Sequence, residues 1–186
     1  LVEDETGRVL LPIARAAIAR DLGRTHSADE LAPWLREPGA CFITLMQQER
    51  LRGCIGTLRA HRALVDDVKA NARAAAFRDP RFKPLAAHEL DETDIEISVL
   101  SALEVVRCTI EQEAVAQLTP GVHGVVFEYG HHSSTFLPQV WAQLADPAEF
   151  MGELKRKAGL PPDFWDTEVK LMRYTVSKWR EADLGN

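Results

Sequence analysis

The chain has 186 residues, 46% of them hydrophobic and 27% charged, which is typical of a globular protein that buries a core without disulfides or a structural metal. Its formal net charge of −6 argues against nucleic acid as the main partner, because phosphate binding requires a basic surface. No apolar run is long enough to span a membrane, no signal peptide is visible, and three scattered cysteines favour the reducing cytoplasm.

The first elements are a helix and a hairpin. Apolar side chains recur at helical spacing over residues 8–22, with Pro12 marking the expected start of the regular helix and Gly23 its end. Residues 40–46 and 51–58 are rich in strand-forming side chains and flank a polar turn. This pattern predicts a β-hairpin.

The middle of the chain alternates between helix and strand. Residues 62–79 predict an amphipathic, alanine-rich helix that ends before Pro80. Residues 94–100 alternate apolar and polar side chains, as a half-covered strand does, and residues 104–108 predict another strand. A short helix follows at residues 111–118.

The C-terminal part repeats the hairpin-then-helix order. Residues 123–129 and 133–137 predict a second hairpin, residues 138–145 and 147–159 are helical, and residues 168–179 predict a single last strand. Strands that are neighbours in sequence are mostly joined as hairpins. We therefore expect an α+β fold with an antiparallel or mixed sheet and two strand-helix repeats.

The segment LRGCIGTL, residues 51–58, contains the most unusual pattern. Cys54 lies between Gly53 and Gly56, and Arg52 precedes it by two residues, which in a regular strand puts both side chains on one face. A nearby cation favours the reactive thiolate, and glycines let a ligand approach the backbone closely. The alternative is that Cys54 is a small packed side chain and that the glycines mark a bulge or a crowded crossing.

The register of the hairpin decides what Cys54 faces. If Met46 pairs with Leu51, Cys54 lies opposite Ile43, on the same face as Cys41 and Arg52, but the sequence does not fix this register.

Two further residues are candidates for the same site. His123, between two glycines, could move protons beside a thiol, although the simpler interpretation is a turn histidine with a solvated ring. Arg81 in FRDPRF could bind an anion if Asp79 holds its guanidinium, and the alternative is a helix-ending turn. His131 and His132 would diverge in a strand, so no metal site is predicted.

Other polar patterns carry no catalytic motif. Asp66 and Asp67 are adjacent on the predicted helix, where they diverge, so we interpret them as a solvated face. The phosphate-binding loops and the serine nucleophile elbow are absent from the sequence, and the identity of any cofactor is unknown from the sequence.

The motifs together resemble the AMME-syndrome candidate-region protein family, whose prokaryotic members are called AmmeMemoRadiSam system protein A. The matching segments are LRGCIGTL, GACFITL, NARAAAFRDPRF, DIEISVLS, GVHGVVF, FLPQVW and LKRKAGL, in the family's order over residues 39–160. The resemblance implies one family domain over residues 1–186, or two lobes of it, with a cleft near residues 51–58. It also implies that two strand-helix repeats build a barrel-like sheet with helices packed outside.

The resemblance carries no established activity. The family's grouping with a Memo-like protein of dioxygenase fold and a radical SAM protein implies these as partners. One hypothesis is an enzyme or binding site for a small anionic ligand, with Cys54, Arg52 and His123 as catalytic residues and Gly53, Gly56 and Arg81 contacting the ligand. The alternative is a non-catalytic adaptor for those partners, and a nucleotide- or RNA-binding protein is disfavoured by the acidic charge.

Overall fold

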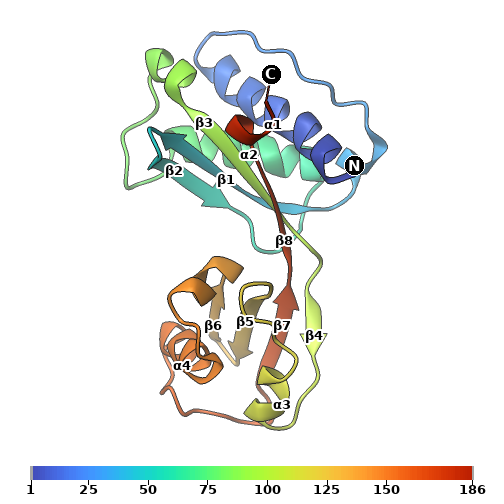
Figure 1. Cartoon of the computed structure of the whole chain (residues 1–186), viewed down its shortest axis with the longest axis vertical. Coiled ribbons are helices and arrows are strands. Elements are labelled where there is room, and N and C mark those ends of the chain that lie inside the picture. The colour runs from blue at the N-terminus through green and yellow to red at the C-terminus, as the bar shows by residue number, and fades with distance from the viewer. Residues whose placement is uncertain (1, 186) are drawn as a thin grey trace. The chain divides into compact units, whose positions relative to one another are not determined.

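The computed structural model describes residues 2–185 and divides them into two compact units (Figure 1). Residues 2–100 and 177–185 form the first unit, and residues 101–176 form the second. Each unit contains a four-stranded sheet and a hydrophobic core of its own. The α+β class is therefore confirmed, and the strands form two sheets rather than a closed barrel.

The sheet of the first unit has its longest strand near the middle. The strand order is β2 (Arg50–Gly56), β1 (Ala40–Gln47), β3 (Asp94–Leu100) and β8 (Val176–Arg180). β1 pairs antiparallel with both β2 and β3. Alternate residues of β1 are fully buried, namely Cys41, Ile43 and Leu45, and this alternation defines the core face of the sheet.

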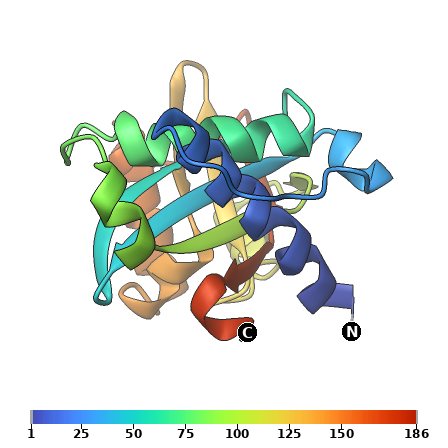
Figure 2. The same cartoon turned by 90° about the horizontal axis from the view of Figure 1, so that it is seen from above.

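Two helices, α1 (Val2–Asp21) and α2 (Leu64–Phe77), cover that core face (Figure 2). α1 runs through Pro12, so the prediction that the regular helix starts at Pro12 is wrong. Proline removes one backbone hydrogen bond, but the two leucines that precede it, Leu10 and Leu11, are buried and keep the helix in place. None of the described helices is long and apolar enough to cross a lipid bilayer.

The second unit repeats the hairpin-then-helix order on a smaller scale. Its strand order is β4 (Glu104–Val106), β7 (Lys170–Tyr174), β5 (Gly124–Tyr129) and β6 (His132–Phe136). A short helix, α3 (Glu111–Val115), and a longer one, α4 (Pro147–Lys157), belong to this unit. Asp146 caps the N-terminus of α4, and its side chain accepts a hydrogen bond from the Glu149 N–H.

The last predicted strand, residues 168–179, is divided between the two sheets. β7 pairs with β4 and β5, whereas β8 lies next to β3 in the other sheet. The interruption falls at Thr175, whose N–H donates to the Ser101 hydroxyl at 2.9 Å and whose carbonyl accepts from the Ser101 N–H at 2.9 Å. The prediction of a single strand is wrong because strand-forming composition does not show where the pairing partner changes.

Candidate functional site

A β-bulge sets the position of Cys54. Thr44 pairs with Cys54, and Leu45 pairs with Gly53, but the next residue of β1 pairs with Leu51. Arg52 is therefore an extra residue in β2, which shifts the register by one. The prediction that Cys54 faces Ile43 and shares a face with Cys41 is wrong, because a bulge moves every following side chain to the opposite face.

The bulge places Cys54 on the face of the sheet that points away from α1 and α2. The Cys54 side chain is partly exposed, and the Thr44 hydroxyl donates a hydrogen bond to its sulfur over 3.3 Å. Cys41 by contrast is fully buried in the core, and burial raises the pKa of its thiol. Of the two cysteines in this hairpin, Cys54 is the accessible one.

The glycines around Cys54 make room for the chain itself. A Cβ atom on Gly53 would lie 2.2 Å from the backbone carbonyl oxygen of Ala75 in α2. A Cβ atom on Gly56 would lie 2.2 Å from the ring of Phe42 in β1. The predicted role of both glycines in ligand contact therefore has a competing explanation, since the space each leaves is already occupied.

The main chain of Cys54 is held by the segment that follows α2. Its N–H donates to Asp79 Oδ2 at 2.9 Å, and its carbonyl accepts from Arg81 Nη2 at 3.3 Å. Asp79 is buried and also accepts from the Nε and Nη2 of Arg81, at 3.0 and 2.7 Å. The Arg81 guanidinium is the largest cause that holds the pKa of Asp79 well below its usual range. The predicted Asp79–Arg81 contact is present, and it fixes the strand that carries the thiol.

The exposure of this ion pair is asymmetric. The Asp79 side chain is 2% exposed, whereas the Arg81 side chain is 54% exposed. Solvent beside the Cys54 backbone therefore meets the positive end of the pair. The ring of Phe82 lies next to it, with its centroid 5.5 Å from the Arg81 guanidinium carbon, within the range of cation–π contact.

Arg52 is bound within the protein. Its Nε and Nη2 donate to the two carboxylate oxygens of Glu89 at 2.9 and 3.1 Å, and its guanidinium carbon is 5.9 Å from the Phe82 ring centroid. Glu89 belongs to a 3-10 helix, η2 (Ala87–Glu92), and its pKa is lowered to about 2, mainly by the Arg52 hydrogen bonds. The Arg52 Nη1 is buried without a hydrogen-bond partner. Arg52 thus anchors the bulge to η2, and this is its observed role.

His123 belongs to the second unit, whereas Cys54 belongs to the first. The Nδ1 of His123 accepts a hydrogen bond from the Thr119 N–H at 2.9 Å, and burial is the main cause that lowers the pKa of the ring. Its carbonyl accepts from the indole N–H of Trp141 at 2.7 Å. These bonds hold the turn in which His123 lies, and its pairing with Cys54 stays a prediction.

A buried polar network that the sequence did not predict lies where β2 ends, next to Thr57. Asp67 is fully buried, and it accepts hydrogen bonds from the Cys41 N–H, the Thr57 hydroxyl, Arg62 and Asn71. The interpretation of Asp67 as part of a solvated face is therefore wrong, while its neighbour Asp66 is exposed. A signal was present, because Asp67 and Asn71 are four residues apart and share one face of α2.

No three histidine, cysteine, aspartate or glutamate side chains lie close enough together in residues 2–185 to hold a metal ion. The site is thus a partly exposed thiol on an edge strand that two carboxylate–arginine pairs fix in place. These features define an α+β protein with two compact units and a cysteine-bearing strand at the edge of the first sheet.

Comparison with known proteins identifies the family. Residues 11–179 match the model of the AMMECR1 family. A protein of Methanothermobacter thermautotrophicus is 36% identical over 97% of this chain and 96% of its own length, and one of Thermococcus onnurineus is 38% identical over 97% of this chain and 92% of its own. The chain belongs to the AMMECR1 family.

A solved structure shares the fold. The crystal structure of the uncharacterized protein PH0010 from Pyrococcus horikoshii superimposes with a TM-score of 0.80 at 34% sequence identity, covering 95% of this chain and 92% of that one.

Proposed function

We propose that the face of the first sheet around Cys54 binds a small anionic ligand, with the Cys54 sulfur in contact with it. The observation that carries the proposal is the Arg81 guanidinium, exposed to solvent while its carboxylate partner is buried. An anion that approaches the Cys54 main chain meets this positive group, the Phe82 ring and the partly exposed sulfur.

The same geometry limits what each predicted residue does in this proposal. Arg81 is the anion-binding group, because its side chain is 54% exposed, whereas the Arg52 side chain is 13% exposed. Gly53 and Gly56 bring β2 close to α2 and Phe42, which positions Cys54 indirectly. The Cys54 thiol is a nucleophile on this face, so a ligand with an electrophilic carbon would react at its sulfur.

Competing alkylating reagents test the proposal. Iodoacetate carries a negative charge and iodoacetamide does not. Both form a sulfur–carbon bond, release iodide and leave the thiol proton with the buffer. We expect the ratio of the iodoacetate rate to the iodoacetamide rate at Cys54 to be several-fold higher in the folded protein than in urea, measured by mass spectrometry of the Cys54 peptide. Cys41, buried and with a raised thiol pKa, should remain unlabelled while the protein is folded.

Arg81→Gln should bring this ratio down to the value in urea, whereas Arg78→Gln, at an exposed arginine three residues earlier, should leave it unchanged. An unchanged ratio in Arg81→Gln, or a Cys54 that neither reagent labels, would contradict the proposal. Either outcome would favour the alternative, in which this chain is a non-catalytic adaptor that binds the family's Memo-like and radical SAM proteins.

A further inference from the structure

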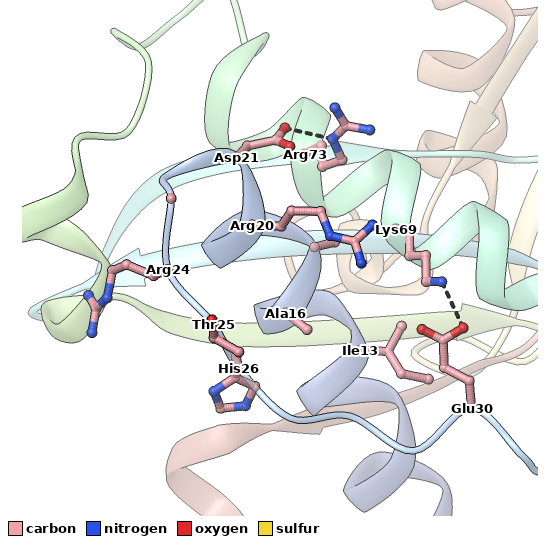
Figure 3. Close-up of a pocket in the computed structure, with 12 residues that line it drawn as sticks. Ile13, Ala16, Arg20, Asp21, Arg24, Thr25, His26, Glu30, Lys69 and Arg73 are labelled. Atoms are coloured by element: carbon pink, nitrogen blue, oxygen red, sulfur yellow. Dashed lines mark hydrogen bonds and ion pairs between the residues drawn. The ribbon is translucent and has the colours of Figure 1, made fainter.

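The two helices of the first unit border a pocket that does not include the Cys54 face. Its volume is about 400 Å³, within the range of small-molecule sites. It is lined by α1, by the loop that follows α1 and by α2 (Figure 3). Three small or apolar side chains of α1, Ile13, Ala16 and Ala17, contribute its apolar wall.

The end of α1 shapes the pocket. Gly23 has a positive φ of 71°, and its N–H donates to the Arg20 carbonyl while the Arg24 N–H donates to the Ala19 carbonyl. These two bonds form a Schellman motif, which reverses the chain after the helix. Loop residues such as Thr25 and His26 therefore also line the pocket. The motif also satisfies carbonyls that would otherwise present a negative helix end to an anion.

The lining is cationic, although the chain as a whole is acidic. It contains four arginine or lysine side chains and two carboxylates, which leaves an excess of two positive charges against the net charge of −6 for the chain. Two cations of α2 are held by the two carboxylates: Lys69 Nζ lies 2.7 Å from Glu30, and Arg73 Nε lies 2.6 Å from Asp21. Lys69 and Arg73 are four residues apart and so project from one face of α2.

Arg20 is the cation that remains without a partner. Among the described residues its guanidinium has no hydrogen-bond or ion-pair partner, while Arg24 is bound by Asp91 outside the pocket. In the view of Figure 3, the Arg20 guanidinium lies between the Asp21–Arg73 pair and the Lys69–Glu30 pair. A planar guanidinium in this position offers paired donors to an oxyanion, and the two neighbouring cations stay fixed around it.

We propose that this pocket is a second ligand site, which binds a small organic phosphate. The phosphate lies against Arg20, whose positive charge no carboxylate balances, and the paired cations Lys69 and Arg73 lie beside it. The apolar part of the ligand lies on the wall at Ala16 and Ala17, which are partly exposed, whereas Ile13 is fully buried. A fully hydrophilic anion would leave this wall in water, so the site favours a ligand with both parts.

Phenyl phosphate is a suitable probe, because it joins a dianion to a flat apolar ring. We expect saturable binding with a Kd of about 1 mM or tighter by isothermal titration calorimetry. The affinity should fall as salt is added, and the backbone amide resonances of Gly23 and Thr25 should shift during an NMR titration. Phenol, which lacks the phosphate, should not bind measurably, and inorganic phosphate should bind more weakly than phenyl phosphate.

Two variants separate the charge from the cavity. Arg20→Gln removes the unpaired cation from an exposed position, and Ala16→Leu fills the apolar wall while leaving every charge. Each should raise the Kd at least tenfold, whereas Arg36→Gln, at an exposed arginine outside the pocket, should leave it unchanged. The proposal is overturned if phenyl phosphate fails to saturate at about 10 mM, if phenol binds as well, or if Arg20→Gln binds as tightly as wild type.

Discussion

At the scale of single residues, close contacts rather than exposed backbone explain the glycines of LRGCIG. Gly53 lies against a backbone carbonyl of α2, and Gly56 lies against the Phe42 ring. Glycine at these positions lets the edge strand approach its neighbours, and the strand then carries the thiol. The pattern was visible in the sequence, but which atom fills each space depends on packing between elements.

Gly53→Ala should destabilise the first unit by about 3 kcal/mol, because its Cβ would lie 2.2 Å from a helix carbonyl that cannot shift cheaply. Urea denaturation would measure the loss. Gly23→Ala provides the matched control, since its Cβ meets no atom within 4 Å and only its positive φ is strained. We expect that variant to lose about 1 kcal/mol. Equal losses in the two variants would show that the contact with α2 is not the cause.

At the scale of elements, β2 is an edge strand whose outer side is partly closed. The Asp79–Arg81 pair occupies both the N–H and the carbonyl of Cys54, which would otherwise be open to another strand. At the bulge, Arg52 ties the same strand to Glu89 in η2. The thiol is thus carried by a strand fixed at two points, which suits a site that must keep its geometry.

The Arg52–Glu89 pair predicts a dependence of stability on pH. The folded pKa of Glu89 is lowered from 4.5 to about 2, so its contribution is fully present above pH 4.5 and is lost as the pH falls towards 2. Glu89→Gln should therefore cost about 1–3 kcal/mol near neutral pH and much less near pH 2, measured by urea denaturation at each pH. Glu92→Gln, at an exposed carboxylate of the same 3-10 helix, should change little. A cost for Glu89→Gln that stays constant across this pH range would contradict the assignment.

At the scale of the whole molecule, the chain passes from the first unit to the second after residue 100 and returns after residue 176. The second unit has a buried charge of its own. Lys155 is 1% exposed, and its Nζ donates to Glu111 at 2.7 Å and to the Phe164 carbonyl at 3.1 Å. An ammonium buried this far depends on its carboxylate partner.

Glu111→Ala should destabilise the second unit by about 3 kcal/mol, because it leaves the Lys155 charge buried and uncompensated. Lys155→Met should cost less, since it removes the charge itself. In Glu111→Ala, hydrogen exchange should be faster for the amides of β5 and β7 and little changed for those of β1 and β3. Equal acceleration in both sheets of Glu111→Ala would show that the two units unfold together.

Part of the candidate site could be predicted from the sequence. Cys54, the Asp79–Arg81 contact and the hairpin were identified because they depend on residues close together in the chain or on strong local composition. The bulge at Arg52 could not be found in this way, since it depends on how two strands share hydrogen bonds. The Arg52–Glu89 pair joins residues 37 positions apart, and no local pattern connects them.

The sequence alone determined the α+β class, the order of the elements and the family, because helical and strand periodicities and a set of ordered motifs are local properties of the chain. Only the tertiary structure decided which face carries the thiol, that Asp67 is buried, and that the last predicted strand is shared between two sheets. Each of these depends on the free energy of contacts between segments that are distant in the sequence. A one-residue shift in register, for example, moves a side chain to the opposite face of the sheet without any change in local propensity.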